Sequence, residues 1–420
     1  MKKTLSDLRA SVWVVMTCFA VYTLLSFSRN AYTAALAGII NDGIFTKTAG
    51  GTINSSFYIT YSLAQIFGSF YVDRVSPFKL VGFAIVGTIL SNVIMELFPT
   101  FTVILIARSF SGLVQFGVWP ALLKIITEYI CPEHRRKSLY IMPLGYSAGA
   151  ILSFLLAAVV LKYGSWQNLF TLTYVFLTVI FVVFCLVIRY ADKKAKPMVR
   201  PAAQTAAAAE AAGEKVSMWQ IIRSSGTIMI FVSAFLASLF AAGIESWMPT
   251  LLMESYQLTP SFSSILSTIG VCAKLLAVFC MVLIYPKFVK NQAAATGIFL
   301  ALMLPLLATL IFVGKIPLLL IILVVVLLYA FRGTVSQFFT TEIPTGYSRY
   351  NRIGMMAGLI NVASCSGYMV EGTIYGYTAD RWGWNATVMI WTVLAFAAMA
   401  AIFSIVPVWR KFTKASDTDA

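Results

Sequence analysis

Six charged side chains lie inside long apolar runs of the sequence. They are Arg29, Arg108, Glu245, Lys274, Arg332 and Glu371. A charge near the centre of a bilayer costs at least about 2.5–3.5 kcal/mol, so residues of this kind are usually paired or functional. Arg108 lies least deep of the six, and the other five comprise three cations and two carboxylates. The excess of one cation predicts that a bound anion balances the charge.

The three deeper cations are candidate contacts for that anion. Arg29 either binds an anionic ligand or links to a backbone carbonyl. Lys274 stands about 12 residues, or ~18 Å, from either end of its run, which is too deep for its ammonium to reach water fully. It therefore either belongs to a binding site or pairs with Glu245 or Glu371. Arg332 begins a polar stretch and is a candidate site or gate residue.

The two carboxylates allow two interpretations. Glu371 and Glu245 either pair with a buried cation or carry a proton, because a buried carboxyl group keeps its proton unless a cation stabilises its charge. For Glu245 the ion pair is the favoured interpretation. The sequence leaves open whether Glu245 pairs with Lys274, with Arg332 or with neither.

The composition identifies the elements that must carry these charges. Of the 420 residues, 60% are hydrophobic and 11% are charged, and the mean hydropathy is +0.85. Soluble chains are roughly 45–50% apolar and about 25% charged. These values exclude a water-soluble enzyme, a disordered protein and a DNA-binding domain. They indicate a protein that crosses a membrane many times.

Apolar segments of spanning length recur along the chain, and a spanning helix needs about 20 apolar residues. We predict an all-α membrane protein with twelve transmembrane helices. The longest polar stretch divides these helices into an N-terminal half at 1–190, a cytoplasmic linker at 191–222 and a C-terminal half at 223–420. Two six-helix halves are typical of transporters that rock one half against the other. The predicted helices cover 11–40, 52–72, 80–98, 101–127, 139–161, 167–189, 226–251, 262–284, 292–313, 316–341, 353–379 and 385–408.

The net charge of +15 is sorted by side rather than gathered in a nucleic-acid patch. With the N-terminus in the cytoplasm, 22 of the 31 Lys and Arg residues fall on the cytoplasmic side and 4 fall outside. Because cytoplasmic loops collect Lys and Arg, this distribution predicts that both termini are cytoplasmic. We expect a multi-pass protein of the cytoplasmic membrane, in contact with lipid and without a nucleic-acid partner.

No arrangement of residues predicts catalysis. The six cysteines show no metal-binding spacing, and the one histidine, His134, lies among loop charges. No nucleophile stands with a base in a recognisable pattern. The sequence therefore predicts no enzyme activity, no metal and no cofactor.

Two motifs suggest close helix packing. The first runs from Gly68 through Asp73 and Arg74, and the second begins at Arg108, continues through Gly112 and precedes Pro120, which predicts a kink. A packed or solvated segment would use similar residues. The first motif resembles the loop signature of the major facilitator superfamily, and the second resembles that superfamily's fourth-helix motif. The resemblance implies a gating role for Gly68, Asp73, Arg74 and Arg108.

Within that superfamily the chain resembles the organophosphate:phosphate antiporters, which exchange glycerol-3-phosphate or sugar phosphates for inorganic phosphate. The resemblance implies the major facilitator fold, a small anionic substrate and a monomer. Four segments carry it, one in each of the first, fourth, seventh and eleventh predicted helices: Ser28-Arg29-Asn30, Gly112 to Pro120, Gly243 to Thr250 and Gly376 to Trp384.

The resemblance assigns a binding site. Arg29 stands where the family has its first phosphate-binding arginine, and Tyr22 and Tyr61 match tyrosines of the cavity. Gln65 and Tyr146 occupy the family's lysine and histidine positions.

One substitution bears on the substrate. Ala241 falls at about the position of the family's second arginine, so the two-arginine clamp that holds a phosphate strongly is incomplete. Lys274 or Arg332 could supply the missing charge from another helix. The departure makes a carboxylate or sulfonate substrate more plausible than in the parent family.

Three functions follow from these residues. The first is a secondary transporter that moves a small organic anion by alternating access, most directly by exchange of organophosphate or inorganic phosphate. The second is a proton-coupled symporter of a carboxylate such as a sugar acid, with Glu371 or Glu245 as the proton carrier. The third is a transporter-like sugar-phosphate sensor, which would bind its ligand without flux.

Overall fold

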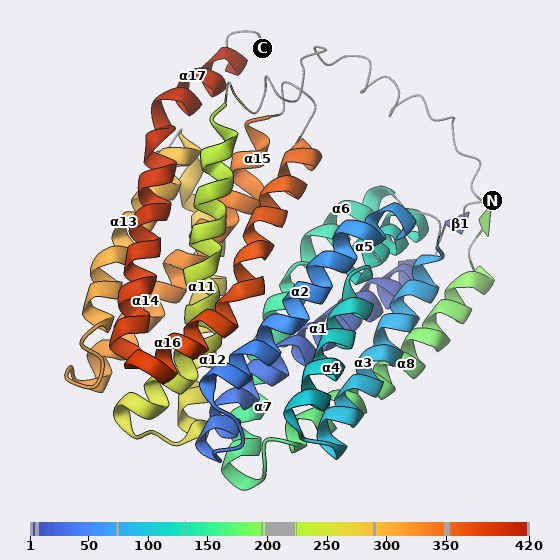
Figure 1. Cartoon of the computed structure of the whole chain (residues 1–420). Coiled ribbons are helices and arrows are strands. Elements are labelled where there is room, and N and C mark those ends of the chain that lie inside the picture. Colours follow the sequence, from blue (N-terminus) through green and yellow to red (C-terminus); the bar gives the residue numbers. More distant parts are fainter. Residues whose placement is uncertain are drawn as a thin grey trace. The chain divides into compact units, whose positions relative to one another are not determined.

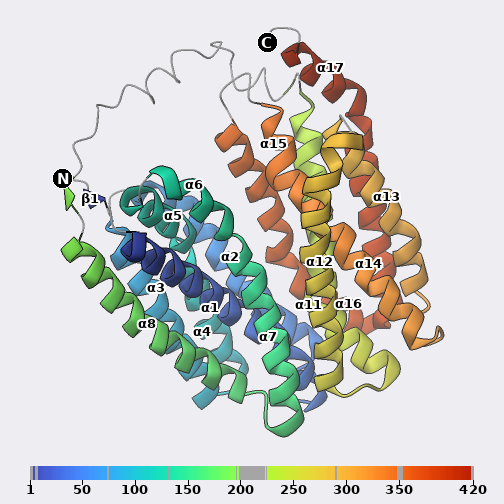
Figure 2. The same ribbon diagram turned by 180° about the vertical axis from the view of Figure 1, so that it is seen from behind.

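The computed structural model is built almost entirely from helices (Figures 1 and 2). Contacts divide the chain into two compact units. One comprises Met1–Arg200 with Leu258–Thr268, and the other comprises Pro201–Gln257 with Ile269–Ala420. The structure describes residues 3–4, 8–72, 75–130, 132–194, 196–197, 223, 225–288, 291–347 and 353–417.

Eight helices are described in the first unit. Their core is made by apolar faces of α1, α3, α5 and α8, among them Val21, Ile85 and Leu122, each fully buried. The helices are α1 (Leu8–Asn41), α2 (Lys47–Val72), α3 (Pro77–Leu97), α4 (Phe101–Gln115), α5 (Val118–Tyr129), α6 (Pro132–Ile141), α7 (Leu144–Tyr163) and α8 (Asn168–Lys194). Two short strands, β1 (Lys3–Thr4) and β2 (Lys196–Pro197), pair antiparallel.

The second unit is organised around α11 (Thr227–Tyr256), which packs along α16 (Ile353–Ser404). Most of α11 is buried, including the run from Leu239 to Met253. The other described helices of this unit are α13 (Gln292–Leu310), α14 (Leu318–Gln337), the π-helix η1 (Phe338–Glu342), α15 (Ile343–Thr345) and α17 (Val406–Asp417). The helix α12 (Pro260–Phe288) begins in the first unit and continues into the second.

Ten of the described helices are long and apolar enough to cross a membrane by length and composition. One of them, α16, has 52 residues and breaks at Gly383, whose φ of 78° and ψ of 179° are not helical. Counting α16 as two helices and adding the 26-residue α2 gives the predicted twelve crossings. Glycine tolerates this positive φ without a steric penalty.

The predicted kink in the fourth spanning segment coincides with a two-residue interruption of the helix. The helix stops at Phe116–Gly117 and restarts at Val118, so α4 and α5 together form one crossing. Pro120 explains the break because it has no N–H to donate to Phe116 and its ring clashes with that carbonyl. The charged segment after α5, which the sequence analysis treated as a loop, forms the short helix α6.

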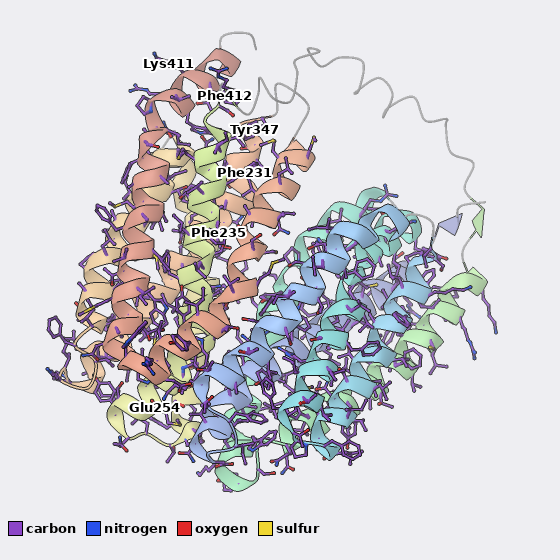
Figure 3. The ribbon with its side chains drawn as sticks, in the orientation of Figure 1. Phe231, Phe235, Glu254, Tyr347, Lys411 and Phe412 are labelled. Carbon is purple, nitrogen blue, oxygen red and sulfur yellow. The ribbon has the colours of Figure 1, made fainter. Side chains whose placement is uncertain are left out.

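The C-terminal helix α17 is held by an aromatic cluster of Tyr347, Trp409 and Phe412 (Figure 3). Trp409 is fully buried and donates from its indole Nε1 to Gln292 Oε1 at 3.0 Å. The Tyr347 hydroxyl lies 2.7 Å from Thr227 Oγ1, and burial raises the pKa of this phenol. The predicted linker lies mostly outside the described residues, with α8 extending to Lys194.

Candidate substrate-binding site

The guanidinium of Arg29 lies among aromatic rings of the first unit. Its Cζ is 4.9 Å from the ring centroid of Tyr61, 5.4 Å from that of Phe57 and 5.8 Å from that of Tyr146. These residues come from α2 and α7, while Arg29 comes from α1. Aromatic faces attract a cation without neutralising it. The cluster of Arg29, Phe57, Tyr61, Tyr146 and Gln115 is called the arginine cage below.

Among the described residues, Gln115 supplies the one hydrogen bond to the Arg29 side chain, from Arg29 Nη2 to Gln115 Oε1 at 3.5 Å. Its amide orientation is set by its neighbours. Thr88 donates its hydroxyl hydrogen to Ala84 O at 2.7 Å, so Thr88 Oγ1 must accept from Gln115 Nε2, which lies 3.2 Å away. Ser111 Oγ accepts from the same Nε2 at 3.1 Å. The amide oxygen of Gln115 therefore faces Arg29.

No carboxylate pairs with Arg29 among the described residues. Its Nε is buried and has no hydrogen-bond partner in the described part of the chain, and the residue as a whole is half-buried. In the described part of the first unit, no Asp or Glu is among the buried residues. A buried donor without a partner is costly, so the in-plane edge of Arg29 is a ready contact for an anion.

Arg108 is 1% exposed and holds the backbone that carries Arg29. Its Nη2 donates to Arg29 O at 2.6 Å, and its Nη1 donates to Ser28 O at 3.5 Å. The Arg108 Cζ also lies 4.6 Å from the Phe57 ring and 5.1 Å from the Tyr32 ring. The charge count made from the sequence left out Arg108 because it lies least deep of the six charged residues. Arg108 is nevertheless buried, so this unit holds more buried positive charge than that count predicted.

Small residues bring these helices together. At Gly112, a Cβ would collide with Phe57 O and Thr60 Oγ1, so α4 approaches the backbone of α2 as the sequence predicted. At Gly149, a Cβ would lie 2.7 Å from Phe27 N, which lets α7 lie against α1. A larger side chain at either position would separate the helices that build the arginine cage.

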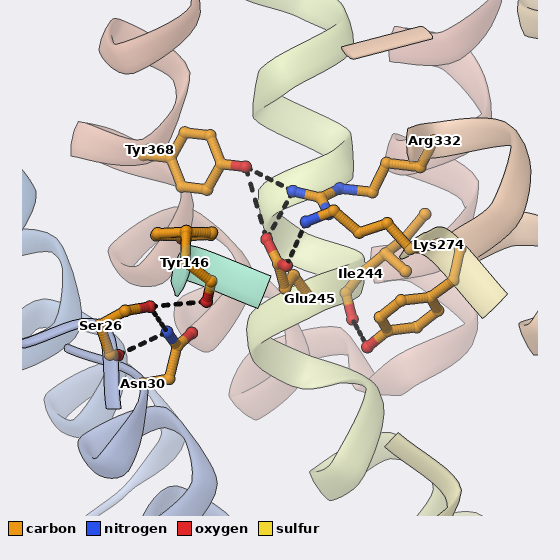
Figure 4. Close-up of polar contacts among 9 residues, drawn as sticks. Ser26, Asn30, Tyr146, Ile244, Glu245, Lys274, Arg332 and Tyr368 are labelled. Carbon is orange, nitrogen blue, oxygen red and sulfur yellow. Dashed lines mark hydrogen bonds and ion pairs between the residues drawn. The ribbon is translucent and has the colours of Figure 1, made fainter. Parts of the chain in front are cut away.

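A hydrogen-bonded pair links α1 to α7 beside the cage (Figure 4). Ser26 Oγ donates to Tyr146 O at 2.8 Å, and Asn30 Nδ2 donates to Ser26 O at 2.8 Å. These contacts fix the start of α7, where Tyr146 stands. The position of the Tyr146 ring near Arg29 is therefore set by backbone contacts on the neighbouring helix.

Two further predicted residues lie near the cage. Tyr22 is two turns before Arg29 on α1, within electrostatic reach of it, and its ring contacts Trp119 at 5.0 Å. Gln65 is half-buried one turn beyond Tyr61 on α2. Phe57 and Gln115 were not among the residues predicted for the site. The spacing of Phe57, Tyr61 and Gln65, four residues apart, was the available signal, because it puts the three on one helical face.

The predicted gating motif is only partly described. Gly68 lies in α2, and Asp73 and Arg74 fall outside the described residues. Arg108, the fourth residue of that prediction, contacts Arg29 as above. The gating role of the motif stays a prediction.

The second unit contains a different charged cluster, in which two cations share one carboxylate (Figure 4). Lys274 Nζ lies 3.0 Å from Glu245 Oε1, and Arg332 Nη2 lies 2.5 Å from Glu245 Oε2. The Tyr368 hydroxyl accepts from Arg332 Nη2 and donates to Glu245 Oε2 at 3.5 Å. The pairing that the sequence left open is thus to both cations. We call Glu245, Lys274 and Arg332 the charge triad.

Glu371, the remaining predicted residue, is fully buried on α16. Its Oε1 accepts a hydrogen bond from Ser246 Oγ at 2.8 Å. Ser246 follows Glu245 directly on α11, so the two carboxylates lie on adjoining parts of the same unit.

The helical fold and the buried charges define a class of protein: a multi-pass membrane transporter. A family model described as "Major Facilitator Superfamily" matches residues 18–372. The chain belongs to this superfamily.

Curated relatives match at low identity. A probable hexose phosphate transport protein of Chlamydia trachomatis is 23% identical over 155 residues, 37% of this chain and 34% of that protein. The chloroplastic sodium-dependent phosphate transport protein 1 of Arabidopsis thaliana is 25% identical over 163 residues, 38% of this chain and 31% of that protein. The membrane sensor protein UhpC of Salmonella typhimurium is 23% identical over 165 residues, 38% of this chain and 37% of that protein. The matches span about a third of these relatives' length.

Solved structures match over nearly the whole chain. A D-xylose-proton symporter has a TM-score of 0.70 at 12% identity, covering 94% of this chain and 98% of that one. A peptide transporter POT in complex with sulfate has a TM-score of 0.69 at 14% identity, covering 96% of this chain and 95% of that one. These likenesses confirm the predicted fold.

Proposed function

We propose that this transporter moves a small organic anion across the cytoplasmic membrane by alternating access, with exchange of organophosphate or inorganic phosphate as its activity. The observation that carries the proposal is the arginine cage, in which the half-buried Arg29 has aromatic and amide neighbours but no described carboxylate partner. An anion bound there satisfies a cation that the protein leaves unbalanced.

The local charge favours a phosphate head group. Arg29 and Arg108 both lie on Phe57, and Arg108 is bound to backbone carbonyls that neutralise no charge. Two positive charges close together attract a dianion more strongly than a monoanion. The names of the relatives, which include hexose phosphate and phosphate transport proteins, support the same substrate class.

The residues around the anion have different roles in the proposal. Arg29 forms the charged contact, and the hydroxyls of Tyr22, Tyr61 and Tyr146 with the amide of Gln65 donate or accept hydrogen bonds to the rest of the substrate. Arg108 acts as a positioning residue, because its bond to Arg29 O fixes the backbone of α1 at the cage.

Lys274 and Arg332 have a different role in this proposal from the one the sequence suggested. Both are engaged by Glu245, so an anion approaching either cation competes with a carboxylate already in place. We assign the triad to balancing charge within the second unit, and the first contact with the substrate to Arg29.

The membrane topology that we propose follows from the distribution of Lys and Arg residues. Twenty-two Lys and Arg residues on one side against 4 on the other support cytoplasmic N- and C-termini. We propose that the chain functions in the cytoplasmic membrane as a monomer.

Counterflow in proteoliposomes tests this function. Vesicles loaded with unlabelled phosphate are placed in labelled phosphate, and uptake is challenged with glycerol 3-phosphate, glucose 6-phosphate and gluconate. We expect rapid phosphate exchange that the two phosphate esters inhibit. Exchange inhibited by gluconate alone, or absent from folded protein, overturns the phosphate assignment. Saturable binding of glucose 6-phosphate without any flux would instead indicate a sensor.

A further inference from the structure

The C-terminal helix α17 has no part in the anion site proposed above. It belongs to the second unit and holds three basic residues, Arg410, Lys411 and Lys414. The helix begins at Val406, and the single residue Ile405 separates it from the end of α16 at the edge of a spanning segment. Its first turns therefore lie where a membrane-spanning helix ends.

One face of α17 is fixed to the second unit by aromatic side chains. The rings of Trp409 and Phe412 each have their centroid 5.4 Å from that of Tyr347 (Figure 3). Gly346 makes room for this contact, because a Cβ there would lie 2.5 Å from Trp409 Cζ2. The hydrogen bond of Trp409 reaches Gln292, the first residue of the spanning helix α13. This face of α17 therefore lies against the end of a second spanning helix.

The other face of α17 is basic. Arg410 and Lys411 are exposed, and neither has an ion pair among the described residues. Val408, which is 40% exposed, lies one helical turn before Lys411. The sequence contains no acidic residue between Asp380 and Asp417. Exposed positive charge therefore lies next to an exposed apolar side chain at the end of a spanning segment.

We propose that α17 is a docking surface for anionic phospholipid headgroups. Arg410 and Lys411 bind the lipid phosphates, and Val408 enters the boundary between the headgroups and the acyl chains. Amphipathic helices with a basic polar face bind anionic bilayers in this way, through charge and through burial of apolar side chains. The predicted topology places this end of the chain at the cytoplasmic leaflet, which is the anionic one.

The placement of the two cations favours a lipid surface over a soluble anion. Consecutive residues of an α-helix point about 100° apart around its axis, so Arg410 and Lys411 diverge. Two diverging cations cannot enclose one phosphate as a clamp does, but they can each contact a separate headgroup of a bilayer. Exposed Val408 would also gain nothing from a small soluble anion.

Lipid bound on the basic face would stabilise the contacts that α17 makes on its other face. Asn291, at the start of α13, donates from Nδ2 to Val406 O at 3.4 Å. Tyr347, against which α17 packs, has its hydroxyl 2.7 Å from Thr227 Oγ1 at the start of α11. Holding α17 in place therefore supports the ends of two further helices of the second unit.

Hydrogen exchange of the full chain in nanodiscs tests this surface. Exchange of the backbone amides of 408–413 is compared in discs of phosphatidylcholine and of phosphatidylglycerol. We expect exchange about tenfold slower in phosphatidylglycerol, because each basic residue near an anionic surface contributes about a factor of five. Equal exchange in the two lipids overturns the proposal.

Variants identify the residues responsible. Arg410→Gln and Lys411→Gln should each remove part of the protection, and the double variant should remove most of it. Lys315→Gln is the matched control, because it removes the same charge from an exposed turn between α13 and α14. An equal loss in Lys315→Gln would show an effect of net charge and overturn the assignment to α17. Thermal unfolding confirms that each variant is folded.

Two measurements on the wild type need no variant. Added salt should abolish the protection by phosphatidylglycerol, because salt screens exposed charges. Protection that is insensitive to salt overturns the proposal. Inorganic phosphate added to phosphatidylcholine discs should give no protection, and protection equal to that of phosphatidylglycerol would replace the lipid surface with a simple anion site. Arg29→Gln should leave the lipid effect unchanged, so this test is independent of the proposed transport function.

Discussion

The two units treat buried cations in opposite ways. In the first, Arg29 and Arg108 contact aromatic rings, an amide and backbone carbonyls, and no described Asp or Glu is buried with them. In the second, Lys274 and Arg332 are both held by Glu245. The chain therefore offsets part of the positive charge of the charge triad with a carboxylate of its own, and leaves the charge of the arginine cage to a ligand.

This difference separates structural from functional charge. Burying a cation and its carboxylate partner costs desolvation energy, which their mutual attraction offsets. Removing the partner leaves the cation buried without compensation and destabilises the fold. A cation held by aromatic faces keeps its charge available to a substrate. By charge alone, Lys274 and Arg332 are as good candidates for binding an anion as Arg29. Their contacts distinguish them, because only Lys274 and Arg332 are paired with a described carboxylate.

The largest effect is expected from removing the shared carboxylate. Glu245→Gln leaves two adjacent buried cations, and breaking a buried pair in this way costs about 3–5 kcal/mol. Thermal unfolding in detergent measures the loss. Adding Lys274→Met to Glu245→Gln should recover part of it, since one of the two cations is then gone. A single variant that melts like wild type would show that the triad does not support the second unit.

Placing a carboxylate in the arginine cage should pair Arg29 with an anion of the protein itself, as Glu245 pairs with Lys274 and Arg332 in the charge triad. Gln115→Glu puts an anion about where Oε1 accepts from Arg29, at 3.5 Å. The built-in anion competes with substrate, and we expect phosphate affinity to fall about tenfold or more, equivalent to 1.4 kcal/mol. Equilibrium binding of labelled phosphate measures this. Gln115→Met, which adds no charge, is the matched control, and equal losses in the two variants would contradict competition by charge.

The close contact of α7 with α1 should be sensitive to a single methyl group. Gly149→Ala places a Cβ 2.7 Å from Phe27 N and displaces the start of α7, where Tyr146 faces Arg29. Overpacking of this kind costs about 1–3 kcal/mol. Gly82→Ala is the control, because its Cβ would meet Phe181 at an ordinary 3.7 Å. Thermal unfolding and phosphate affinity should both fall in the first variant and hold in the second.

The smallest effect is expected at Tyr61. Tyr61→Phe retains the ring 4.9 Å from Arg29 and loses only the hydroxyl, whereas Tyr61→Ala also loses the cation–π contact. That contact is worth about 0.5–2 kcal/mol. Phosphate affinity should therefore follow the order wild type, Phe, Ala. If Phe were as weak as Ala, the hydroxyl rather than the ring would be the contact that matters.

The sequence was sufficient to predict the spanning segments and the charged residues inside them, because burying a charge in a membrane is costly. Spanning segments, the fold and the depth of Arg29, Lys274 and Glu371 could be located because apolar runs and isolated charges are local features. The break near Pro120 also followed from the missing N–H of one residue.

The remainder depended on which helical faces meet. Gln115 could not be assigned to the cage because its orientation depends on Thr88, which lies on another helix. Arg108 was taken as the least deep cation, and its contact with Arg29 O requires the close approach of two helices. The pairing of Glu245 with two cations likewise joins three separate helices. Long-range contacts of this kind leave no spacing pattern in a single sequence.

Anion binding at the arginine cage is tested most directly by comparing one cation from each unit. Phosphate counterflow is measured in proteoliposomes containing Arg29→Gln or Lys274→Gln, with the folded fraction of each variant determined first. Arg29→Gln should abolish exchange, because the unbalanced cation is removed. Lys274→Gln should retain part of it, because Arg332 still holds Glu245. Exchange at the wild-type rate in Arg29→Gln would contradict the central claim that the arginine cage binds the anion.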